Sequence, residues 1–233
     1  MNTINKVGEK HGLSINITKT KLMIISRQPH TKAQLKINNQ IIEQVKKFKY
    51  LGTTLNSTWD CDVEVKTRVA IARTAFAKFN NYLLRREVSL NLRIRVLKCY
   101  IWPILMYGSE TWSLKLRSLN RVEAFEMWCL RRLLKIPWVD HITNEEVLRR
   151  ANTQRKLLDL VKQRKVSYLG HIVRNDKYKL LNIILMGKIE GRRGPGRKRH
   201  SWLRDIRNWC DIPDISTIIR RAEEGSLSIQ QPA

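Results

Sequence analysis

An apolar seam between residues 65 and 83 constrains the fold of this chain more than any other feature. Its members are spaced alternately four and three residues apart: Val65, Val69, Ala72, Phe76, Phe79 and Leu83. An α-helix places residues at this spacing on one face, so the seam predicts a long helix that packs against other helices. Lys66 and Arg73, seven residues apart, share a different face of the same helix.

Residues 1–55 follow a different pattern, which predicts short strands and turns. A helix near the N-terminus is expected to end at Gly12, because glycine readily adopts the left-handed conformation of a helix C-terminus. The stretches 13–17 and 22–25 alternate in polarity or are rich in β-forming residues, which favours strands. The stretch 34–45 predicts a β-hairpin that turns at two adjacent asparagines.

A further short strand is predicted just before the helical region begins. Phe48 and Tyr50 alternate with Lys47 and Lys49, and Gly52 ends the run. Alternate residues of a strand point to opposite faces. We therefore expect the aromatic face to pack and the cationic face to meet solvent or an anion.

Helical spacing continues after the seam and predicts a bundle. Ser89, Thr143 and Asp214 stand where a side chain caps a helix, and Thr153 is expected to cap a further long helix. Pro103 is expected to kink or end the helix that Ser89 begins, because proline has no N–H for the helical hydrogen bond.

The long helix that follows Thr153 carries positive charge beside its apolar side, at Lys162, Arg164 and Lys165. A later helix places Trp202 and Trp209 on one face, where packing is the better interpretation than stacking on bases.

These patterns together predict an α+β fold that is mostly α. A small N-terminal antiparallel β-hairpin segment is followed by a helical bundle and a basic helical C-terminal region. The expected domains are residues 1–55, 56–136 and 137–233.

The charge balance indicates a polyanionic partner. The chain carries 45 Lys and Arg against 20 Asp and Glu, a formal net charge of +25 over 233 residues. RNA and DNA are the first candidates. No apolar run is long enough to span a bilayer, so no transmembrane segment is expected. Four scattered cysteines predict reduced thiols packed in helices and an intracellular location, nuclear or cytoplasmic.

Positive charge is concentrated in residues 149–200, which hold 16 Lys and Arg against three acidic residues. A loop at 191–200 contains three glycines and a proline, which oppose helix formation. Its cations are Arg192, Arg193, Arg197, Lys198 and Arg199. Phosphate binding, a nuclear import signal and a solvated linker are all compatible with this composition.

The sequence contains no pattern for a self-contained catalytic site. There is no nucleophile-elbow, P-loop or zinc-protease motif, and no adjacent pair of aspartates. Metal-dependent phosphoryl transfer needs clustered carboxylates to hold the ions. We therefore expect these residues to form no enzyme active site, to hold no metal or other cofactor and to take no small-molecule substrate.

Several segments, taken together and in order, resemble one family. They are Gly12-Leu13-Ser14-Ile15-Asn16 with Lys19-Thr20-Lys21-Leu22-Met23, Phe48-Lys49-Tyr50-Leu51-Gly52, Tyr107-Gly108-Ser109-Glu110-Thr111-Trp112, Ile142-Thr143-Asn144-Glu145-Glu146-Val147-Leu148, Leu169-Gly170-His171-Ile172, and Gly194-x-Gly196-Arg197 followed by Ser201-Trp202-Leu203. They resemble the end of the palm, the thumb and the region beyond it in reverse transcriptases of insect-type non-LTR retrotransposons.

The resemblance implies roles for some residues. Lys19, with Lys21 beside it, would lie near the incoming nucleotide, and residues 48–52 would form the primer-grip hairpin. The helix that carries Lys66 and Arg73 would lie along the template–primer duplex. The magnesium-binding aspartates of that family have no counterpart in this sequence.

The main hypothesis is a non-catalytic fragment of an RNA-directed DNA polymerase that binds RNA or DNA through phosphate contacts. The nucleic-acid-binding residues predicted from sequence are Lys19, Lys21, Lys47, Phe48, Lys49, Tyr50, Gly52, Lys66, Arg73, Arg192, Arg193, Arg197, Lys198 and Arg199. The alternatives are a helical module that a host has adopted to bind an unknown protein partner, and a basic helix that binds a membrane surface.

Overall fold

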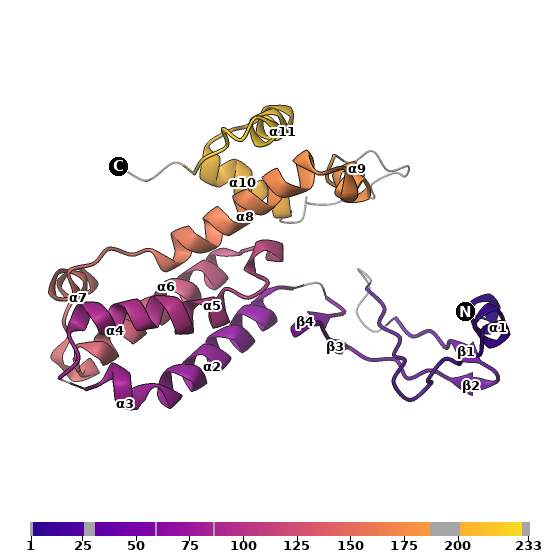
Figure 1. The fold of residues 1–233 in the computed structure, drawn as a ribbon, viewed down its shortest axis with the longest axis horizontal. Coiled ribbons are helices and arrows are strands. Elements are labelled where there is room, and N and C mark those ends of the chain that lie inside the picture. The colour runs from indigo at the N-terminus through magenta and orange to yellow at the C-terminus, as the bar shows by residue number, and fades with distance from the viewer. Residues whose placement is uncertain (1, 26–30, 59, 86, 187–200, 230–233) are drawn as a thin grey trace. The chain divides into compact units, whose positions relative to one another are not determined.

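The computed structural model describes residues 2–25, 31–58, 60–85, 87–186 and 201–229, and they divide into two compact units, residues 1–64 and 65–233. Figure 1 shows the order of the elements. The described residues confirm the α+β, mostly α fold predicted from the sequence. The basic loop 191–200 lies outside the described residues.

The first unit combines one helix with two small β-hairpins. Helix α1 (Asn2–Lys10) ends before Gly12, which has a φ of +70° as expected for a helix C-terminus. Strands β1 (Lys36–Ile37) and β2 (Gln40–Ile41) pair antiparallel. Both asparagines of their turn have positive φ, which confirms the predicted hairpin, although its strands are shorter than expected.

The stretches 13–17 and 22–25 do not form the strands predicted for them. Their one β contact is an isolated bridge between Leu22 and Gln44. A strand needs a neighbouring strand along its length to satisfy its N–H and C=O groups. Strands β1 and β2, of two residues each, are too short to provide one. The prediction of strands at these two stretches was therefore wrong.

The second hairpin of this unit consists of β3 (Lys47–Tyr50) and β4 (Thr53–Asn56). Lys47 lies opposite Asn56, and Tyr50 opposite Thr53. The two turn residues, Leu51 and Gly52, have φ values of +45° and +80°. Two positive φ angles are typical of the tight turns whose twist matches that of paired strands.

The second unit is all helical among its described residues. Its helices are α2 (Asp62–Lys78, whose first turn contains the division between units), α3 (Asn80–Leu83), α4 (Leu90–Val96), α5 (Trp102–Leu105), α6 (Leu116–Leu133), α7 (Asn144–Ala151), α8 (Leu157–Arg174), α9 (Lys179–Leu185), α10 (Trp202–Cys210) and α11 (Ile215–Glu223). Short 3₁₀ turns occur at Ser109–Thr111, Trp138–Asp140 and Asp176–Tyr178.

The apolar seam of α2 faces the core as predicted. Val65, Ala72 and Phe76 are 1% exposed or less, and Leu83 of α3 is fully buried. Helix α8 lies alongside α10 and α11 (Figure 1). A second apolar cluster joins these three helices, with Leu169, Ile206 and Ile218 at its centre. Removal of this apolar surface from water is what holds the helices together.

Proline 103 produces a local widening of the helix and not a break. A π-helical turn, Leu97–Ile101, joins α4 to α5, and the Trp102 N–H donates to the Leu97 carbonyl five residues back. Pro103 stands in the first turn of α5, where a missing N–H costs least. Helical structure therefore continues through the proline without a break.

Three of the predicted caps are present. Ser89 accepts a hydrogen bond from the Leu92 N–H, Thr143 from Glu146 and Asp214 from Thr217. Thr153 does not cap α8, which begins four residues later, at Leu157.

The cap of α8 comes from another helix. The Glu126 carboxylate, on α6, accepts hydrogen bonds from the N–H groups of Lys156 (3.0 Å) and Leu157 (3.2 Å). Burial raises the pKa of Glu126 above 4.5, although these two hydrogen bonds and Arg155 act in the opposite direction. A carboxylate at a helix N-terminus also meets the positive end of the helix dipole.

Lys165, one of the three cations that the sequence places beside the apolar side of α8, lies in the interior of the fold. Its side chain is fully buried, and its ammonium group pairs with Asp205 of α10 and donates to the Trp112 carbonyl at 2.8 Å. The same Nζ lies 5.0 Å from the ring centroid of Trp202 and 5.2 Å from that of Trp209. These contacts join α8 to α10 and confirm that both tryptophans pack.

Candidate nucleic-acid interface

The β3–β4 hairpin presents its predicted binding residues to solvent on both faces. All four residues of β3 are exposed, with Phe48 at 37% and Tyr50 at 58%. The prediction that this aromatic face packs was therefore wrong, because a two-stranded ribbon has no third layer against the aromatics within its own unit. Among the described residues, neither Lys47 nor Lys49 pairs with a carboxylate. The hairpin thus offers cations and stackable rings together.

Lys19 and Lys21 differ in how far their charges are already neutralised. Lys21 Nζ lies 2.5 Å from Glu43 Oε2. Lys19 is exposed, and its backbone N–H donates to the Asn16 side chain. An exposed ion pair contributes little stability and is readily exchanged, so both lysines remain able to meet a phosphate.

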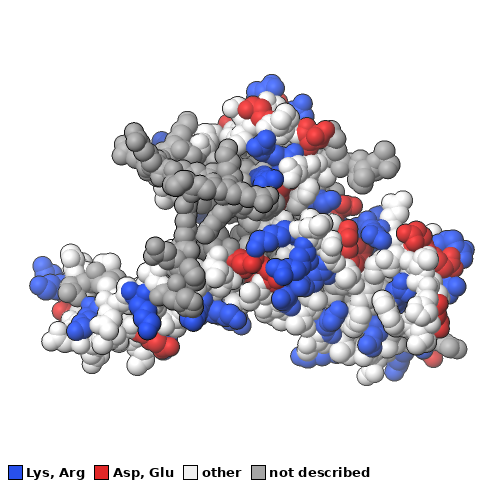
Figure 2. Space-filling view, turned by 180° about the vertical axis from the view of Figure 1, so that it is seen from behind, with Lys and Arg blue, Asp and Glu red and all other residues white. Residues whose placement is uncertain are grey.

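In the second unit, Lys66 and Arg73 are both exposed on α2, as their spacing predicted. The Arg73 guanidinium carbon lies 5.1 Å from the ring centroid of Trp128, on α6. Arg192, Arg193, Arg197, Lys198 and Arg199 lie outside the described residues, so the structure gives no geometry for them. Figure 2 shows that Lys and Arg side chains are spread widely over the face in view.

Arg73 lines a groove of about 890 Å³. Four arginines line it against one carboxylate, that of Glu123. They are Arg73 of α2, Arg131 and Arg132 of α6, and Arg155 before α8. Two tryptophans, Trp128 and Trp138, share the same lining. Trp138 is exposed and Trp128 is half-buried. Arginine beside accessible aromatic rings is a combination that binds phosphates and bases.

The four arginines of the groove are held differently. Arg132 lies over Trp128 at 5.0 Å, as Arg73 does at 5.1 Å. Arg131 donates to the Ile142 carbonyl (2.7 Å) and to Asn144 Oδ1 (3.0 Å), which fastens the segment before α7. Arg155 lies 3.9 Å from Glu123. The stacked pair therefore has the charges most available to an anion.

Among the lining residues of this groove, Arg73 alone is one of the nucleic-acid-binding residues predicted from sequence. Trp128 and Arg132 are four residues apart on α6 and so share a helix face, which is a local signal for a stacked pair. Trp138 follows Pro137, and the proline indicates the end of α6. Nothing in the local sequence indicates that α2 meets α6 at these side chains.

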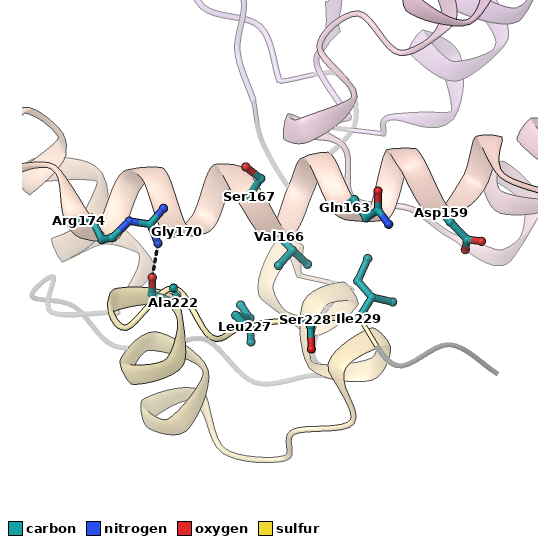
Figure 3. A pocket seen from close by; sticks show the side chains of 11 residues that line it. Asp159, Gln163, Val166, Ser167, Gly170, Arg174, Ala222, Leu227, Ser228 and Ile229 are labelled. Atoms are coloured by element: carbon teal, nitrogen blue, oxygen red, sulfur yellow. Dashed lines mark hydrogen bonds between the residues drawn. The ribbon is translucent and has the colours of Figure 1, made fainter. Parts of the chain in front are cut away.

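A second pocket, of about 410 Å³, lies between α8 and the segment that follows α11 (Figure 3). Arg174 closes one end by donating to the Ala222 carbonyl. Gly170 makes room for this arginine, since a Cβ there would come within 2.7 Å of its Nη1. The one acidic residue in the lining of this pocket is Asp159. The arginine is thus already engaged within the fold, and the first groove is the better candidate.

The described residues contain no group of three or more His, Cys, Asp or Glu side chains arranged to hold a metal ion. None of the helices in the described ranges is both long and apolar enough to cross a membrane.

The architecture defines a basic protein with a small antiparallel-hairpin unit and a larger helical unit in which arginines and tryptophans share a groove. Its sequence is similar to the RNA-directed DNA polymerase from mobile element jockey of Drosophila funebris, with 24% identity over 131 residues, 55% of this chain and 14% of that protein. The jockey polymerase of Drosophila melanogaster is 24% identical over 132 residues, 56% of this chain and 14% of the relative.

A putative uncharacterized transposon-derived protein of Caenorhabditis elegans is 28% identical over 177 residues, which are 70% of this chain and 60% of that protein. These homologues confirm the resemblance to retrotransposon polymerases that the motifs indicate. The chain spans only a small part of the jockey polymerases' length. No family model matches the chain, and no solved structure matches it.

Proposed function

We infer that this chain is a non-catalytic portion of a non-LTR retrotransposon RNA-directed DNA polymerase, which binds a template–primer of RNA or DNA through its phosphates. The observation that carries this proposal is the cationic groove around Arg73, where four arginines face one carboxylate. The jockey relatives are named as RNA-directed DNA polymerases, so nucleic acid is the polyanion that their chemistry requires. A nuclear or cytoplasmic location follows from that role.

The proposed contacts are sequence-independent. Arginine and lysine side chains on exposed faces meet phosphates, which carry no base identity, and they release condensed counterions when they bind. The exposed cations of the β3–β4 hairpin and of α2 would add contacts of the same kind. Affinity should therefore depend strongly on salt and weakly on sequence.

The test measures binding of a random-sequence duplex by fluorescence anisotropy at several salt concentrations. We expect log K to fall linearly with log salt, with a slope of about 0.9 for each phosphate contacted. Arg73→Gln should lower the magnitude of that slope by about one. Arg220→Gln removes the same charge from α11, where Arg220 lies 3.5 Å from Glu224, and should leave the slope nearly unchanged. Affinity that is constant across salt would contradict the proposal.

The non-catalytic part of the proposal has its own assay. The purified chain is incubated with a primed RNA template, deoxynucleotides and either Mg²⁺ or Mn²⁺. We expect no extension of the primer, because polymerases need clustered carboxylates and this sequence has no adjacent aspartate pair. Incorporation of nucleotides by the pure protein would overturn this part and leave the binding proposal standing.

A further inference from the structure

The most exposed large aromatic side chain of the described residues lines the arginine groove. Trp138 is 80% exposed, although tryptophan usually buries most of its ring. It forms part of the groove wall together with Trp128. A large apolar ring left in solvent beside several cations is a feature of binding surfaces.

The segment that carries Trp138 is fastened on both sides. Pro137 precedes the short 3₁₀ helix Trp138–Asp140, and proline restricts the backbone there. On the other side, Arg131 holds Ile142 and Asn144 through the hydrogen bonds described above. An aromatic ring on a fixed backbone loses little conformational freedom when a ligand stacks on it.

The two stacked arginines supply the anion-binding part of the same groove. Arg73 and Arg132 lie over the Trp128 ring, which itself packs edge-on against Phe76 at 5.1 Å. Among the described residues, neither arginine forms an ion pair with a carboxylate. A guanidinium held over an aromatic ring by cation–π attraction still has N–H groups that can donate to a phosphate.

We propose that this groove binds an unpaired stretch of RNA or DNA, with a base stacked on Trp138 and neighbouring phosphates on Arg73 and Arg132. Bases inside a duplex are stacked on one another and present no free face, so stacking on Trp138 would add affinity for a single strand to the phosphate contacts that a duplex also makes. The volume of about 890 Å³ falls within the range of about 300–1,000 Å³ typical of small-ligand sites. This inference rests on the proposed function and adds to it a preference for unpaired nucleotides.

The experiment compares two fluorescein-labelled probes, a random-sequence single strand and a duplex closed at both ends by loops of abasic spacer. Trp138→Ala should weaken binding of the single strand by at least about fivefold, which is the lower end of base–aromatic stacking. Binding of the closed duplex should be unchanged. Trp138→Phe, which retains a ring, should recover most of the affinity. Far-UV circular dichroism checks that each variant is folded.

Val139→Ala is the matched control. Val139 is the next residue, is 75% exposed and does not line the groove, so its variant should bind both probes as the wild type does. Equal loss for both probes in Trp138→Ala, or no loss for either, would overturn the stacking role while the proposed function stands. A wild-type chain that binds neither probe in a salt-dependent way would overturn both proposals.

A third measurement separates nucleic acid from an acidic protein partner. Tryptophan emission is titrated with oligonucleotide or with polyglutamate, and the Trp138→Ala titration is subtracted. Quenching by the oligonucleotide alone supports the proposal. Quenching by polyglutamate and not by the oligonucleotide would show that the groove binds acidic peptide, and the proposal would be wrong.

Discussion

The buried pair of Lys165 and Asp205 allows the sharpest stability prediction for this fold. The two side chains are 0% and 2% exposed. Lys165→Met retains the length of the side chain and removes its charge, which leaves the Asp205 carboxylate in the interior without its ammonium partner. Loss of one partner of a buried ion pair typically costs about 3–5 kcal/mol, because the remaining charge stays desolvated.

The structure places the expected cost near the lower end of that range. The Asp205 carboxylate also accepts a hydrogen bond from the Leu114 N–H at 2.9 Å, which continues to stabilise the charge in the variant. We therefore expect a loss of about 3 kcal/mol in the free energy of unfolding. At roughly 2–4 °C per kcal/mol for a unit of this size, the melting temperature should fall by about 6–12 °C.

Urea unfolding followed by circular dichroism measures this effect. Lys162→Met is the control, since Lys162 stands on the same helix, keeps part of its surface exposed and lies 3.5 Å from Asp159. The free energy of unfolding of Lys162→Met should fall by less than about 1 kcal/mol. In a double-mutant cycle, Lys165→Met with Asp205→Leu should cost clearly less than the sum of the single changes. A loss below about 1 kcal/mol for Lys165→Met, or strict additivity, would refute this reasoning.

Three further predictions concern other parts of the fold. Burial raises the folded-state pKa of Glu126 above 4.5, so the folded chain binds the carboxyl proton of Glu126 more tightly than the unfolded chain does. The stability that this proton contributes is complete below pH 4.5 and is lost as the pH rises through the raised pKa. The urea midpoint of the wild type should therefore fall relative to that of Glu126→Gln between mildly acidic and neutral pH, and parallel curves would contradict this. Leu51→Asn should stabilise the β3–β4 hairpin by about 1 kcal/mol, seen as slower amide exchange, because Asn tolerates the φ of +45°; faster exchange would contradict it. A thiol reagent should modify the exposed Cys99 first and the buried Cys129 only on unfolding, because burial raises the pKa of the Cys129 thiol, and Cys99→Ser should remove the fast phase.

Sequence patterns predicted correctly those features whose physical cause lies within a few residues of the chain. The seam of α2 faces the core because its spacing matches the helix, and Ser89 caps α4 because a hydroxyl there reaches an N–H three residues on. The asparagine turn forms because both residues tolerate positive φ. These features depend only on residues that are close in sequence.

The remaining features depend on residues that are distant in sequence. Asp205, the partner of Lys165, lies 40 residues further along the chain. The residues close to Lys165 in sequence therefore give no sign that its charge is paired and buried. Phe48 and Tyr50 alternate as a half-buried strand does, but burial requires a layer that their own unit does not supply. The groove of Arg73 and Trp138 likewise exists only because α2 and α6 pack together.

The cap that α6 supplies to α8 has a consequence for the order of folding. The first turn of a helix is the costly step, and α8 completes its own with the Glu126 carboxylate, 30 residues before Lys156. Helix α8 can therefore complete its first turn only when α6 lies beside it. We expect α8 to gain structure no earlier than α6 in kinetic experiments, and substitution of Glu126 should slow the formation of α8.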